Sequence, residues 1–272
     1  MFTVPSRTGF AHLRQYTLGV LVGVTFLCVP ADRTEACAIM NGCVLIVPNG
    51  CTYVVSGTES YCVVFVANGG VLELADGAVL EISDSLTIDT DSQTPANSGV
   101  FRFYADDGET APILRTTDSL EISGPITVED PADGDGGAGG TIAAETASDW
   151  VILSGTITAQ HGLLNITSDI EVDGTILANA SATARRISFT GEILEGSTGL
   201  IEASGNSNAR VLFASGSAFD LDSAMDLKVA NSARMRFVDT SDYVLAGGFS
   251  MAAGFFDVDA NVSLEFTGAY TH

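Results

Sequence analysis

Pairs of aspartates two residues apart are one feature of this sequence that could do chemistry. On a β-strand, residues i and i+2 share a face, so each pair could present two carboxylates to one hard cation such as Ca²⁺, which takes six to eight oxygen ligands. Asp133 and Asp135 lie in a glycine-rich stretch and are the candidate Ca²⁺ ligands; the alternative is that these acids are simply solvated. The pairs are Asp89/Asp91, Asp133/Asp135, Asp220/Asp222 and Asp257/Asp259.

A small basic cluster is the second such feature. Arg234 and Arg236 share a strand face, with Asp239 close behind them. Arginines beside acids suit an acidic polysaccharide, so these three residues form an alternative polysaccharide site, for a lyase or hydrolase. His161 is predicted to be a surface residue at a turn, and the sequence has no G-x-S-x-G nucleophile motif. No catalytic residue is therefore assigned.

Four cysteines, Cys37, Cys43, Cys51 and Cys62, lie close together in the sequence. Their intervals are irregular and no histidine lies between them, which argues against a zinc site. An even number of cysteines in an exported chain indicates disulfides, although the sequence leaves all three pairings open. Free buried thiols are the alternative.

Residues 1–36 have the layout of a secretory signal peptide. Basic residues and no acid occupy 1–16, the uncharged apolar run 18–29 follows, and small residues come after Pro30. The apolar run is shorter than the roughly 20 residues that span a bilayer, and the alternative is an N-terminal membrane anchor. We expect a secreted or cell-surface protein.

The charge balance narrows the choice of partners. The chain carries 34 acidic against 11 basic residues, a net charge of −23. Such a surface repels nucleic acid phosphates and anionic membranes, so neither is an expected partner. Solubility and divalent-cation binding are the two interpretations of the acidity.

A repeated phrase indicates the elements that must position these residues. Two apolar residues one apart are followed by a glycine and then an apolar residue, at 120–126, 151–157, 170–176 and 187–193. Alternation with period two predicts strands, and Gly174 is expected to turn the chain through a positive φ. Stacked strands would bury Ile126, Ile157, Ile176 and Ile193 in one column. The sequence predicts an all-β parallel β-helix, with an antiparallel sandwich or barrel as the alternative.

The domain organisation follows from this pattern. Residues 37–70 hold the four cysteines and are expected to form a disulfide-stapled N-terminal cap, and 71–272 the β-helix repeats. Residues 130–140 are a Gly/Asp-rich loop inserted into one turn of the helix, either functional or merely tolerated. The strand pattern continues to the last residue. We therefore expect a stacking partner, or further chain, to cover the C-terminal end.

The four phrases resemble the turns of right-handed β-helix passenger domains, as in autotransporters and filamentous-haemagglutinin-like adhesins. The resemblance covers roughly 71–268 and implies an exported protein with a structural, adhesion or binding role, with surface glycans or proteins as partners. No translocator barrel is expected within these residues. A calcium-dependent carbohydrate-binding module is a further alternative.

Overall fold

The computed structural model describes part of the chain between residues 38 and 271. The chain divides into two units, Met1–Asp32 and Arg33–His272, and every described residue belongs to the second. No helix in the described ranges is long and apolar enough to cross a membrane. The description leaves out residues 1–37, 92, 95–96, 106–108, 130–138, 161, 180–184, 195, 215–217, 220–223, 239–241, 246, 261 and 272.

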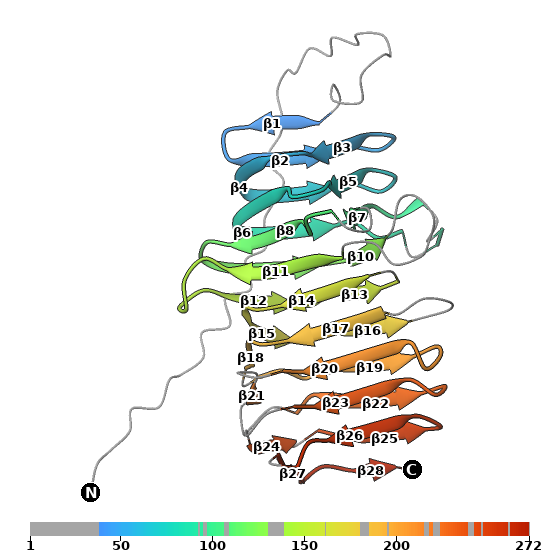
Figure 1. Cartoon of the computed structure of the whole chain (residues 1–272). Helices are drawn as coiled ribbons and strands as arrows, with labels where there is room; N and C mark the ends of the chain where they lie inside the picture. Colours follow the sequence, from blue (N-terminus) through green and yellow to red (C-terminus); the bar gives the residue numbers. More distant parts are fainter. Residues whose placement is uncertain are drawn as a thin grey trace, which may run out of the picture. The chain divides into compact units, whose positions relative to one another are not determined.

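The second unit is built from short parallel strands that repeat on three faces (Figure 1). One passage of the chain through the first, second and third face, such as Ile113–Glu129, is called a coil below. Each strand pairs with the strand of the same face in the next coil. The first face contains β8 (Ile113–Thr116), β11 (Gly140–Ala144), β14 (Leu163–Ile166), β17 (Arg185–Phe189), β20 (Ala209–Phe213), β23 (Arg234–Phe237) and β26 (Phe255–Val258).

The second and third faces follow the same plan. The second face contains β9 (Ser119–Ser123), β12 (Trp150–Leu153), β15 (Asp169–Val172), β18 (Glu192–Ile193) and β21 (Ala218–Phe219). The third contains β3 (Thr52–Val55), β5 (Val71–Leu74), β7 (Val100–Tyr104), β10 (Pro125–Glu129), β13 (Thr156–Ala159), β16 (Thr175–Asn179), β19 (Leu200–Ser204), β22 (Asp226–Ala230), β25 (Phe249–Ala252) and β28 (Tyr270–Thr271).

The remaining strands lie at the two ends of the stack. β4 (Thr58–Val66) and β6 (Val79–Ile88) each pass through the first and second faces, and β2 (Val44–Val47) pairs with the second half of β4. β24 (Asp242–Leu245) and β27 (Ser263–Phe266) form a separate parallel pair. β1 (Ile39–Asn41) pairs antiparallel with β2, and the other pairings among the described strands are parallel. This order is compatible with the predicted parallel β-helix and does not fit an antiparallel sandwich.

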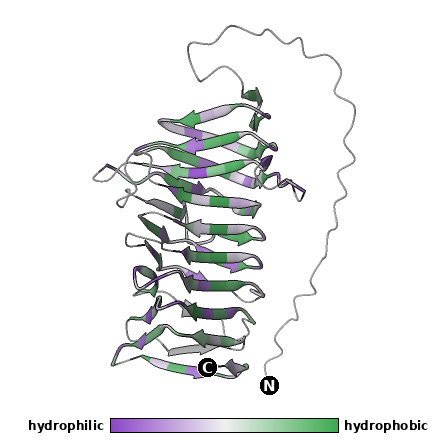
Figure 2. Cartoon of the chain, turned by 90° about the vertical axis from the view of Figure 1, so that its right-hand side faces the viewer, coloured by the Kyte–Doolittle hydropathy of each residue, from purple (hydrophilic) through white to green (hydrophobic). Residues whose placement is uncertain are grey.

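Side chains alternate between half-buried and fully buried along strands such as β15, as the period-two pattern predicted. The hydropathy of the residues along the ribbon is shown in Figure 2. In-register pairing then places like residues above one another. Ile126 pairs with Ile157, Ile157 with Ile176, and Ile176 with Ile201, and all four are fully buried. The interior is therefore a set of columns, each packed between its own neighbours along the stack.

The predicted place of Ile193 in this column was wrong. Ile193 is buried but pairs with Ile170 on the second face, and Ile201 occupies the position above Ile176. The phrase at 187–193 runs from the first face to the second, whereas the other three run from the second to the third. The strands of this phrase still pair in parallel, but they lie on the first and second faces and not on the second and third.

The corner between the second and third faces is a column of glycines. A Cβ on Gly174 would lie 1.8 Å from the carbonyl oxygen of Gly155, and one on Gly155 would lie 2.1 Å from that of Gly124. Those carbonyls accept hydrogen bonds from the amides of Thr175, at 2.9 Å, and Thr156, at 3.0 Å. The expected positive φ at Gly174 was wrong, because it is found at Gly124 and not at Gly174. Glycine is needed at 155 and 174 because the backbone of the previous coil is too close for a side chain.

The cysteine-containing segment runs directly into the stack. Cys43 and Cys62 form a disulfide that links the chain ahead of β2 to β4. Cys51 is disulfide-bonded as well, to a partner outside the described residues. The predicted disulfide involvement of Cys43, Cys51 and Cys62 is thus confirmed, and Cys37 lies outside the described residues.

The interior column gives a first prediction. Ile176→Asp places an unpaired carboxylate at a fully buried position, which costs several kcal/mol against a total stability of about 5–15 kcal/mol. We expect loss of folded protein, measured by far-UV circular dichroism melting. Glu171→Ala, on an outward position of neighbouring β15, is the control and is expected to melt nearly normally. Equal effects of the two changes would contradict the inward and outward assignment.

The glycine corner gives a second prediction. Gly174→Ala must displace the backbone of the previous coil, so we expect destabilisation at or above the roughly 1–3 kcal/mol typical of overpacking. Gly57→Ala is the matched control, since a methyl group there would have no neighbouring atom within 4 Å and the φ of Gly57 is not positive. Its melting temperature should stay near that of the parent chain. A tolerated alanine at 174 would show that the coils can separate at this corner.

Candidate functional site

Three arginines on the first face stand in line across neighbouring strands. Arg186 of β17 pairs with Arg210 of β20, which pairs with Arg234 of β23. All three side chains are exposed, and adjacent strands lie about 4.7–4.9 Å apart. These residues are called the arginine row below. A second column beside it contains buried Ser188, half-buried Leu212 and exposed Arg236.

An aromatic column fixes the strands that carry the row. Phe189, Phe213 and Phe237 project inward from the same three strands and are fully buried. The rings of Phe189 and Phe213 stack with centroids 5.1 Å apart, and those of Phe213 and Phe237 with centroids 4.4 Å apart. Close-packed aromatic side chains leave the sheet little freedom to shift, so the spacing of the outward arginines is set by the core.

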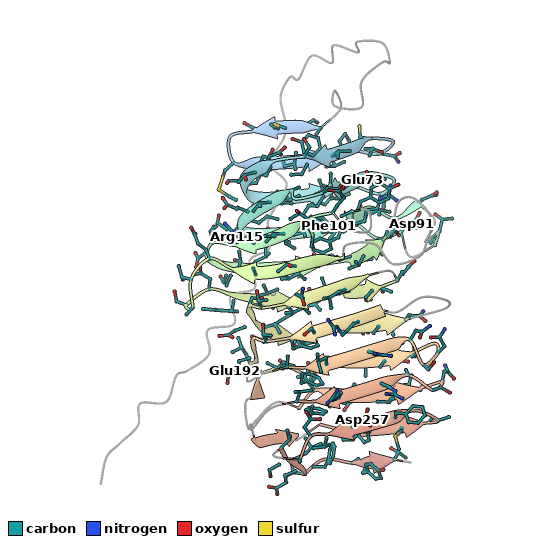
Figure 3. The ribbon with its side chains drawn as sticks, viewed as in Figure 1. Glu73, Asp91, Phe101, Arg115, Glu192 and Asp257 are labelled. Carbon is teal, nitrogen blue, oxygen red and sulfur yellow. A yellow bond between two sulfur atoms is a disulfide. The ribbon has the colours of Figure 1, made fainter. Side chains whose placement is uncertain are left out.

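Elsewhere in the described chain, basic side chains lie beside acids. Three ion pairs join neighbouring strands at paired positions: Arg102 with Glu73, Arg115 with Glu81 at 3.2 Å, and Lys228 with Glu202 at 3.2 Å. Glu73 and Arg115 are marked in Figure 3. Arg102 also contacts Glu129, at 2.9 Å. Opposite charges at paired positions stabilise a sheet, and like charges destabilise it.

The arginine row breaks this pattern. Arg186, Arg210 and Arg234 have no ion-pair partner among the described residues, and each lies opposite another arginine. The guanidinium of Arg234 stacks over the exposed ring of Phe255, 4.9 Å from its centroid. The chain has a net charge of −23, yet none of the described acidic residues forms an ion pair with an arginine of the row. Within the described residues, the charges of the row are therefore not neutralised by ion pairs.

A shallow hollow lies over these strands. It is lined by Arg186, Arg210, Val211, Leu212, Arg234, Arg236 and Asp257, and its volume is about 120 Å³. Pockets for small molecules are usually about 300–1,000 Å³. The hollow can therefore seat an anionic group or one segment of an extended ligand, and not a whole enclosed substrate.

The predicted polysaccharide site is located only in part. Arg234 and Arg236 both line the hollow, whereas Asp239 lies outside the described residues. The acids that accompany the arginines are Asp257 (Figure 3), which is paired with Arg236 in the sheet, and Asp259, which accepts a hydrogen bond from Arg236 at 2.9 Å.

Sequence reasoning missed Arg186 and Arg210 as members of the site. One signal for them existed, since Arg186, Arg210 and Arg234 follow one another at intervals of 24 residues. The repeated phrases begin 31, 19 and 17 residues apart and do not show that period.

The aspartate pairs give no metal centre in the described part of the chain. Asp133 and Asp135 lie outside the described residues. The Asp91 carboxylate accepts hydrogen bonds from the amides of Gln93 and Thr94 and from the Thr94 hydroxyl, and these hold the pKa of Asp91 below its usual value. That carboxylate closes a loop. No group of three or more His, Cys, Asp or Glu side chains able to hold a metal occurs among the described residues.

No protein-family model, curated protein or solved structure matches this chain significantly.

The row itself yields a third prediction. Arg210→Ala removes one exposed charge that lies between two like charges, so the melting temperature should stay unchanged or rise, most clearly at low ionic strength. Arg236→Ala, which removes the pairing with Asp259, is the comparison and should give no such rise. A marked fall in melting temperature for Arg210→Ala would mean that the row serves the fold and not a ligand.

Proposed function

We propose that this chain is an exported parallel β-helix, with a disulfide-containing N-terminal cap, that binds anionic ligands through the arginine row. The observation that carries the proposal is the column of three exposed arginines without acidic partners among the described residues, in a strongly acidic protein. Arginine presents a planar fork of donors that fits carboxylates, sulfates and phosphates, and its weak hydration lets it release water at low cost.

The role we propose is binding and not catalysis. The seven residues that line the hollow supply guanidinium groups, one carboxylate and apolar side chains, and no histidine, cysteine or lysine is among them. Guanidinium groups stay protonated at any physiological pH, so they hold anions and do not exchange protons with them. A surface presented by a rigid stack suits attachment to a polyanion outside the cell, as in the exported adhesins that the repeated phrases resemble.

Export is part of the proposal. Residues 1–36 have the features of a signal peptide, and the Cys43–Cys62 disulfide is consistent with an oxidising compartment. The partners we propose are anionic glycans or proteins at a cell surface.

Binding of dextran sulfate, with neutral dextran as the control polymer, tests the function. We expect the chain to bind dextran sulfate with an affinity that falls as salt is added, and to ignore neutral dextran. Arg210→Ala should weaken binding about fivefold, the effect of losing one exposed charge contact. Lys228→Ala removes the same charge from the third face and should bind like the parent chain. Equal losses from both variants, or no binding at all, would refute the proposal.

A further inference from the structure

The direction of the arginine row constrains the shape of its ligand. The row runs across β17, β20 and β23, so it lies along the stacking direction of the coils and perpendicular to the strands. Its charges repeat at the strand spacing, about 4.7–4.9 Å. A ligand that contacts all three arginines must be linear, lie along the stack, and carry negative charges at a similar interval.

Two common polyanions do not meet this condition. Phosphates of a nucleic acid strand in a duplex rise about 3.4 Å each along the axis and wind around it, so successive phosphates do not lie along a straight row. The charges on one face of an extended acidic peptide repeat every second residue, about 6.4–6.8 Å, which is wider. In a polysaccharide with one carboxylate on every sugar, successive charges are one pyranose ring apart along the chain, a length comparable to the strand spacing. Rotation about the glycosidic bonds must turn these carboxylates toward one side for all three to face the row.

The neighbours of the row are suited to sugar rings. Phe255 of β26 is the next paired position after Arg234, and 48% of its surface is exposed. At the other end of the row, Leu163 of β14 pairs with Arg186 and is half-buried. One face of the Phe255 ring lies under the Arg234 guanidinium, and the rest of this exposed ring offers an apolar surface for the C–H face of a pyranose.

One acid marks the edge of the site. Asp257 lines the same hollow, on the strand that follows β23, and its carboxylate repels a carboxylate of the ligand. Arg236 is engaged with Asp259, so it offsets this repulsion only in part. The three arginines therefore define the number of ligand charges that bind well.

We propose that the arginine row binds a linear polyuronate, lying along the stack with one carboxylate at each of Arg186, Arg210 and Arg234. This inference rests on the proposed anion-binding function and adds to it the ligand class, its orientation and its minimum length.

Titration calorimetry with galacturonic acid oligomers of one to six units tests the inference. For the full chain we expect affinity to rise with each unit up to three or four and then to level off, as each arginine and then the Phe255 ring gains a contact. Arg210→Ala should flatten the rise between two and four units, because the middle contact is missing. Lys228→Ala should keep the parent profile.

Asp257→Asn should change the affinity for the ligand in the opposite direction. Removing that carboxylate should tighten binding of the trimer at low salt, and an unchanged or weaker affinity would overturn the assigned edge of the site.

Linear polyphosphate of matched charge number is the second probe. The polyuronate inference is overturned if polyphosphate binds as tightly as the uronate, or if uronate affinity does not grow with length. In either case, binding of dextran sulfate would still support the proposed anion-binding function. Failure of all three polymers to bind refutes both.

Discussion

The close approach of successive coils at the glycine corner is the constraint on which the rest of this structure depends. At Gly155 and Gly174 the backbone of one coil lies so near the previous coil that a methyl group cannot fit. Amide-to-carbonyl hydrogen bonds across the same corner hold each coil in register with the last. Because the side-chain period of a strand is two, a slip of one residue would turn every inward residue outward. The corner thus decides which residues enter the columns.

In-register stacking has opposite effects inside and outside the stack. Inside, stacking of identical apolar side chains in successive coils is favourable, and the Phe189, Phe213 and Phe237 rings pack face to face. Outside, like on like is unfavourable for charged residues, and the pairs of Arg115 with Glu81 and of Lys228 with Glu202 avoid it. The arginine row lies on the same three strands as the aromatic column, three residues ahead of it. A rigid, well-packed interior at this place tolerates an outward column whose own electrostatics are repulsive, and this combination distinguishes the row from the rest of the described surface.

The sequence was sufficient to predict the strands, but it was not sufficient to predict the number of residues in each coil. Alternation around Ile126, Ile157 and Ile176 predicted the strands and the buried column, because burial and period-two geometry are local properties. The column's fourth member was misjudged because Gly191 resembles the other corner glycines but lies at a different corner, where its Cβ would meet the carbonyl of Ser168. Arg186 and Arg234 lie two coils apart and 48 positions apart in the sequence, and only the length of the coils between them brings them into line. That length varies, since strands of the first face from β8 onward begin 21 to 27 residues apart.

The 24-residue interval between the arginines has an evolutionary consequence. Tandem duplication of one such segment would add a whole coil, with one more phenylalanine inside and one more arginine outside, and would leave the contacts of every other coil as they are. The reach of the row would then grow by one strand spacing per duplication. Under the proposed binding role, the length of polymer that the row contacts would then change in whole steps, by duplication of existing residues.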